Sequence, residues 1–164
     1  VLPVAEEYHV RLANHIADPP TSEGFGGITR WNSADVFKGI KRFAQLSDSP
    51  SHGFNLCLGS VAEGLKDPKK EILPIIKWVG DRKQIFNVHF RNIIGGFINF
   101  QEVYPDNGDM DMFQVIKALR DVGYDGMVMP DHIPSHANRE AGLQGFAFAF
   151  GYIKALIQAA GSGA

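Results

Sequence analysis

Apolar and polar positions divide this chain into short apolar runs and longer segments of helical periodicity. Four short runs, each followed by polar residues and a turn signal, predict buried strands over residues 9–15, 54–58, 85–90 and 127–129. Apolar residues at helical spacing predict helices over about residues 34–46, 68–79, 111–122 and 144–159. Strands and helices therefore alternate along the chain.

Local signals mark several of the helix ends. Ser33 is placed to cap the first helix, the Asp67-Pro68 pair suits the start of the second, and Gly123 follows the third. Residues 2–8 have the pattern of the later part of a helix, without a start signal before them. We therefore expect the chain to be cut from a longer protein.

The alternation of strand and helix predicts an α/β fold with a parallel sheet and right-handed crossovers. About four βα units form either a small open sheet or half of a (β/α)8 TIM barrel. The cut helix at the start favours the barrel, so we expect residues 1–164 to be one domain, the C-terminal half, with the N-terminal half absent. Two long Gly- and Pro-rich loops, 16–32 and 93–109, are candidate functional segments.

The bulk composition limits the partners and the compartment. A net charge of −2 and 45% hydrophobic residues are ordinary for a globular domain, and they give no reason to expect nucleic acid or a membrane surface as partner. No apolar run approaches the ~20 residues of a membrane-spanning helix. Cys57 is the only cysteine, which excludes an intrachain disulfide and fits a reducing compartment. A cytoplasmic location is the default expectation.

Polar residues of metal-binding type end all four predicted strands: His15, Cys57, His89 and Asp131. Ligands and catalytic groups of parallel α/β folds collect at the carboxyl ends of the strands. Two imidazoles, a thiolate and a carboxylate suit a divalent transition ion and disfavour Ca²⁺. Each residue has an ordinary alternative, because a single Cys is more often a core residue and a His or Asp at a strand end is more often structural. Because all four predicted strands end in such a residue, a shared metal site is the interpretation that competes with these ordinary ones.

Neighbouring residues are candidates for binding and proton transfer. Arg91, Asn92 and Arg30 could hold a substrate, and a guanidinium favours a carboxylate, as in a sugar acid. Arg91 could equally pair with an Asp on the rim of the sheet. His132 is the best general acid–base candidate, because its ordinary pKa lies near neutral pH.

Several segments resemble consecutive motifs of the mannonate dehydratase family. They are NHIADPP (14–20), LCLGS (56–60), VHFRN (88–92), NFQEV (99–103), GDMDM (108–112), MPDH (129–132) and GYIKAL (151–156). The resemblance implies a xylose-isomerase-like barrel that needs a divalent metal, commonly Mn²⁺, with Fe²⁺, Co²⁺ or Ni²⁺ as alternatives. It also implies that the metal ligands are His15, Cys57, His89 and Asp131 and that His132 has an acid–base role.

The same resemblance implies the reaction. Members of the family remove water from D-mannonate to give 2-keto-3-deoxy-D-gluconate, a step of hexuronate (glucuronate) catabolism. The chain departs from some members by having no tyrosine between Asp131 and Tyr152. Two other functions stay open: a sugar isomerase or epimerase on the same barrel, and a non-catalytic half-barrel fragment that associates with a partner. The sequence leaves a homo-oligomer open as well.

Overall fold

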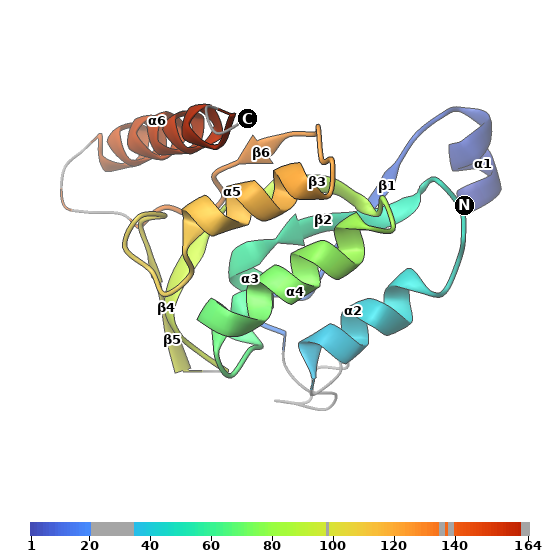
Figure 1. The fold of residues 1–164 in the computed structure, drawn as a ribbon, viewed down its shortest axis with the longest axis horizontal. Helices are drawn as coiled ribbons and strands as arrows, with labels where there is room; N and C mark the ends of the chain where they lie inside the picture. Colours follow the sequence, from blue (N-terminus) through green and yellow to red (C-terminus); the bar gives the residue numbers. More distant parts are fainter. Residues whose placement is uncertain (21–34, 98, 135–136, 138–139, 162–164) are drawn as a thin grey trace.

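The computed structural model describes residues 1–20, 35–97, 99–134, 137 and 140–161. These residues form two sheets and a set of helices (Figure 1). In chain order the elements are α1 (Leu2–Glu7), β1 (Leu12–His15), α2 (Val36–Ala44), β2 (His52–Cys57), α3 (Leu58–Glu63), α4 (Pro68–Gly80), β3 (Ile85–His89), β4 (Asn92–Gly96), β5 (Asn99–Val103), α5 (Met112–Asp121), β6 (Val128–Met129) and α6 (Ala141–Gly161).

The larger sheet has the strand order β1-β2-β3-β6, and every neighbouring pair is parallel. This confirms the α/β fold with a parallel sheet that the alternation predicts. Helices α2, α4 and α5 lie next to one another along one face of the sheet, and α6 lies beyond α5 (Figure 1). Strand-to-helix connections of this kind bring successive carboxyl ends to the same edge of the sheet.

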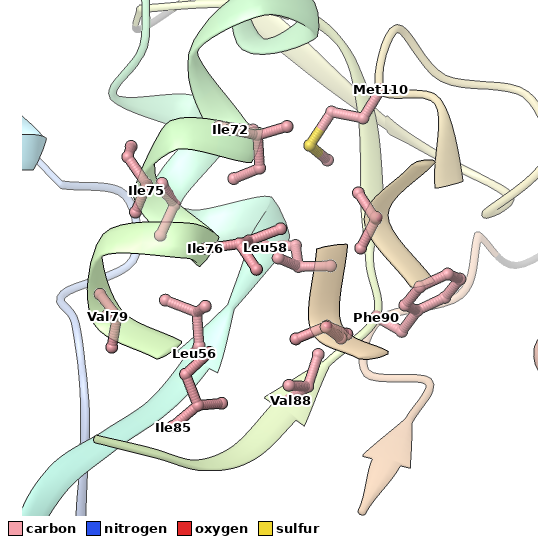
Figure 2. Packing of buried hydrophobic residues seen from close by; sticks show 14 of the residues in the cluster. Leu56, Leu58, Ile72, Ile75, Ile76, Val79, Ile85, Val88, Phe90 and Met110 are labelled. Carbon is pink, nitrogen blue, oxygen red and sulfur yellow. The ribbon is translucent and has the colours of Figure 1, made fainter. Parts of the chain in front are cut away.

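The core lies between the sheet and the helices that cover it. Figure 2 shows Ile76 of α4 beside Leu58, with Leu56 of β2 and Val88 of β3 nearby, and all four side chains are essentially inaccessible to water. Burial of such residues supplies the main favourable free energy of folding, about 25 cal/mol for each Å² of apolar surface removed from water. The apolar stripes of α2, α4 and α5 thus supply the buried residues of these helices, whereas Phe146, Phe148 and Phe150 of α6 stay exposed.

Side-chain caps and a proline explain where the helices begin. Asp35 accepts a hydrogen bond from the backbone N–H of Lys38, and α2 begins directly after it. Asp111 caps α5 in the same way, and Pro68 occupies the first turn of α4 as predicted. The predicted cap Ser33 lies outside the described residues, and Asp35 is the N-cap of α2 instead. Helix α6 runs from Ala141 to Gly161, longer at both ends than its apolar pattern predicts.

Two elements differ from the prediction. The segment 93–109, expected to be an open loop, contains the antiparallel hairpin β4–β5, which brings Asn92 opposite Val103. Leu58, expected to end the second strand, is instead the first residue of α3. Every residue of α3 is buried, so its apolar pattern has no exposed side and resembles the end of a buried strand. Most of the other long loop, 16–32, lies outside the described residues.

Among the described residues, none of the helices combines the length and the apolar character that a bilayer-spanning segment requires.

Candidate metal centre

Four potential metal ligands from distant parts of the chain meet at the carboxyl edge of the parallel sheet. His15, Cys57 and His89 are the last residues of β1, β2 and β3, and Asp131 follows β6. Their ligand atoms all lie within 4.8 Å of one another. The strand register explains the meeting, because Cys57 pairs directly with His89 in the parallel ladder.

Hydrogen bonds orient the two histidines of this cluster. Nδ1 of His15 donates to the backbone carbonyl of Ile16 (2.6 Å), which leaves Nε2 available to the cluster. The Asn55 side-chain amide hydrogen-bonds to Nε2 of His89 (2.9 Å), and Asn87 in turn donates to the Asn55 oxygen (3.0 Å). Nδ1 of His89 is buried without a hydrogen bond and lies 3.4 Å from Asp131. Nδ1 can bind a metal in the tautomer that carries its proton on Nε2, the nitrogen next to the Asn55 side chain.

Cys57 is fully buried in the centre of the cluster. Burial by itself would raise the pKa of its thiol, but the neighbouring imidazoles of His15 and His89 and the charge of Arg91 outweigh it and lower the pKa to about 6. The hydrogen bond with Cys57 outweighs the effect of burial on His15 and raises the pKa of its imidazole to about 9. The sulfur is therefore a thiolate at neutral pH, the form that binds metals.

His132 lies on the exposed rim beside the cluster, with 53% of its side chain accessible. Its Nδ1 is 2.8 Å from Oε1 of Glu102, and this hydrogen bond raises the pKa of the imidazole. Because Nδ1 is engaged with Glu102, Nε2 is the nitrogen left to act on a substrate. The pair can therefore take up or release a proton next to the four candidate ligands.

The three predicted substrate-binding residues have different positions. Arg91 has no accessible side-chain surface, and it pairs with Asp18 (2.8 Å), which is the alternative left open by the sequence. Asn92 is also buried: its amide donates to the carbonyls of Pro105 and Met110, and its oxygen accepts from two backbone N–H groups. Three of these four hydrogen bonds hold the segment after β5, at Pro105 and Met110. Arg30 lies outside the described residues.

Some residues of the site were not predicted. Asn55 and Asn87 could have been found, because strand side chains alternate and these residues precede Cys57 and His89 by two positions, on the same face. Glu102 carried no such signal, because it reaches the site from the hairpin that the sequence pattern did not predict. Glu63 was missed because it belongs to the unpredicted helix α3.

A parallel α/β sheet with a mixed nitrogen, sulfur and oxygen cluster at its carboxyl edge defines the class: an α/β protein with a candidate centre for a divalent transition metal. The sequence profile of the family described as D-mannonate dehydratase (UxuA) matches residues 1–162. The chain therefore belongs to the D-mannonate dehydratase family, a family of hydro-lyases.

Individual relatives agree with this membership. The chain is 37% identical to the mannonate dehydratase of Streptococcus suis over 134 residues, which cover 80% of this chain and 35% of that protein. It is 36% identical to the mannonate dehydratase of Enterococcus faecalis over 167 residues, which cover 97% of this chain and 44% of that protein. The chain thus spans less than half the length of these relatives.

Solved structures give the same result. The crystal structure of mannonate dehydratase from Streptococcus suis serotype 2 matches with a TM-score of 0.81 at 34% identity, covering 98% of this chain and 46% of that one. A xylose isomerase domain protein from Planctomyces limnophilus matches with a TM-score of 0.64 at 16% identity, covering 98% of this chain and 51% of that one. This second likeness shows the fold alone, which is of the xylose-isomerase-like TIM-barrel type.

Proposed function

We propose that this chain is the metal-binding part of a mannonate dehydratase, which removes water from D-mannonate to give 2-keto-3-deoxy-D-gluconate. One observation carries the proposal: in a chain of this family, four potential ligand atoms converge within 4.8 Å at the carboxyl edge of the sheet. The donor chemistry supports a divalent transition ion, with Mn²⁺ as the first choice and Fe²⁺, Co²⁺ or Ni²⁺ as alternatives.

The ligands in this proposal are His15, Cys57, His89 and Asp131. The residues fit such an ion because Cys57 is a thiolate at neutral pH and Nδ1 of His89 is buried without a hydrogen bond. A bound ion would polarise carboxylate and hydroxyl oxygens of the substrate and stabilise the negative charge that develops beside the carboxylate.

His132 is the proposed acid–base group. The reaction removes a proton from the carbon next to the carboxylate and hydroxide from the following carbon, and these two fragments leave together as water. Nε2 of His132 either accepts the first proton or donates one to the departing hydroxyl, while Glu102 holds Nδ1. The exposed position of His132 lets a substrate approach it from solvent.

We further propose that residues 1–164 form one domain, the C-terminal half of a (β/α)8 barrel. The coverage of about half of each matched barrel structure supports this. So does the face of the sheet opposite α2, α4 and α5, where Ala13 and His15 are exposed among the described residues. The other barrel half would cover this face and the free strand edges.

Turnover by the full-length protein tests the reaction. With Mn²⁺ present, we expect NMR to show D-mannonate converted to its 2-keto-3-deoxy product. Conversion to an isomer of mannonate without loss of water would favour the isomerase or epimerase alternative and contradict the dehydratase. No conversion of any kind by the full-length protein, together with a folded 164-residue chain that contains no metal, would favour the non-catalytic half barrel.

Metal content tests the ligands separately. We expect Cys57→Ser and His89→Ala to lose most of the bound metal, measured by elemental analysis after gel filtration. The matched control is His9→Asn: His9 lies outside the cluster and has a φ of 55°, which asparagine tolerates. Full metal content in Cys57→Ser or His89→Ala would contradict the assignment.

A further inference from the structure

The guanidinium of Arg91 connects the two functional parts of the candidate site. Its Nη1 contacts Oε1 of Glu102 and lies 2.9 Å from Nδ1 of His132. Its Nε lies 3.7 Å from Asp131, one of the four candidate ligands. A single rigid group therefore touches the proposed acid–base pair on one side and a proposed metal ligand on another.

The third guanidinium nitrogen of Arg91, Nη2, contacts Asp18 and residues of the buried helix α3. Nη2 donates to Asp18 (2.8 Å) and to the hydroxyl of Ser60 (2.9 Å), and it lies 2.9 Å from Oε1 of Glu63 and 3.7 Å from the sulfur of Cys57. Ser60 and Glu63 both belong to the buried helix α3. The Arg91 side chain has no accessible surface, so water does not compete for these contacts.

We infer that Arg91 is a positioning residue, which sets where the His132–Glu102 pair lies relative to the candidate metal ligands. The inference rests on the proposed function, because the distance between the His132–Glu102 pair and the metal ligands matters only if both act on one substrate. A guanidinium is planar and presents its N–H donors at fixed angles, so contacts on its different edges cannot shift independently. A lysine would keep the charge but would lose the fixed geometry.

Gly59 provides the space that Arg91 occupies. A β-carbon at position 59 would overlap Nε of Arg91 and would lie 2.8 Å from its Cζ. Gly59 lies inside α3, where the backbone is helical and alanine would be unstrained. The absence of a side chain at position 59 therefore leaves room for the guanidinium of Arg91. Gly59→Ala should displace the guanidinium, while every charged group of the site remains.

Binding of Co²⁺ to the full-length protein tests the inference. Cobalt replaces other divalent ions, and its visible absorption depends on the geometry of its ligands and on thiolate bonding. We expect Arg91→Lys and Gly59→Ala each to weaken Co²⁺ binding by about 10- to 100-fold, the usual loss when a group behind the ligands is removed. We also expect both variants to change the absorption bands.

Gly151→Ala is the matched control, because a β-carbon at this helical position meets nothing within 4 Å. It should bind Co²⁺ with the affinity and the spectrum of the wild type. If Arg91→Lys fails to fold, Gly59→Ala still tests the inference, because this variant keeps Arg91 and all of its charged partners. Wild-type binding and spectrum in a folded Gly59→Ala or Arg91→Lys protein would overturn the inference and leave the proposed function intact. Failure of the wild type itself to bind Co²⁺ would overturn both.

Discussion

The interaction between His15 and Cys57 shifts the protonation of both side chains. The pKa of the thiol falls to about 6, and the pKa of the imidazole rises to about 9. Between these values the pair consists of a thiolate and an imidazolium ion. An imidazole binds a metal only in its neutral form, so metal binding has to remove the proton from His15.

These two pKa values predict how many protons are released when a metal ion binds. At pH 7.5 we expect binding of Mn²⁺ to release about one proton, because the sulfur is already ionised and His15 is not. The apparent affinity should rise by about tenfold per pH unit between the two pKa values and level off above the higher one. Calorimetry in two buffers of different ionisation enthalpy measures the count. In Cys57→Ser the residual binding should release fewer protons, and a pH-independent wild-type affinity would contradict the prediction.

A second prediction concerns His132. We expect His132→Gln in the full-length protein to lower kcat by about 100-fold or more, because an acid–base group typically contributes that much. The metal content should stay unchanged, since His132 is beside the cluster of candidate ligands and not within it. Steady-state kinetics with parallel elemental analysis checks both, with His9→Asn as the control. Wild-type kcat in His132→Gln would remove this residue from the mechanism.

A third prediction follows from Glu63, whose side chain is fully buried. Burial first, and then the hydrogen bond with Asp18, raise the pKa of its carboxyl to about 9 despite the nearby Arg91. The folded state therefore retains a proton that the unfolded chain loses above its ordinary pKa of 4.5. Stability falls with pH wherever the folded state binds more protons, so this contribution declines across that window.

Glu63→Gln should remove this decline. The difference in the free energy of unfolding between the variant and the wild type should increase in favour of the variant from pH 5 to pH 9. The increase should be at most about 1.4 kcal/mol per pH unit. Urea titrations at several pH values measure the difference. Glu7→Gln, at an exposed position of α1, is the control and should leave the pH profile unchanged. Parallel profiles for Glu63→Gln and the wild type would show that Glu63 ionises normally.

A fourth prediction tests the core in Figure 2. Ile76 of α4 has no accessible surface and belongs to the same core cluster as Leu58 and Leu56, so Ile76→Ala should lower the free energy of unfolding by about 2–5 kcal/mol. Leu46, which is 69% exposed, is the control, and Leu46→Ala should change it by less than about 0.5 kcal/mol. Equal effects at the two positions would contradict this packing.

The sequence by itself determined the parallel α/β fold and the four residues that meet at its carboxyl edge. Both follow from local pattern, because apolar runs and helical periodicity are set by a few neighbouring residues. Parallel strands then bring their carboxyl ends together whatever lies between them. The strand-end positions of His15, Cys57, His89 and Asp131 therefore follow from the sequence pattern.

The tertiary structure alone decided what surrounds these four residues. The partners of Arg91 come from positions as distant as Asp18 and His132, so no window of the sequence contains their arrangement. Glu102 reaches His132 only because β4 and β5 pair, whereas Gly95 and Gly96 are residues typical of a loop. Periodicity is a local property of the chain, whereas burial of a charged network depends on contacts between segments far apart in sequence.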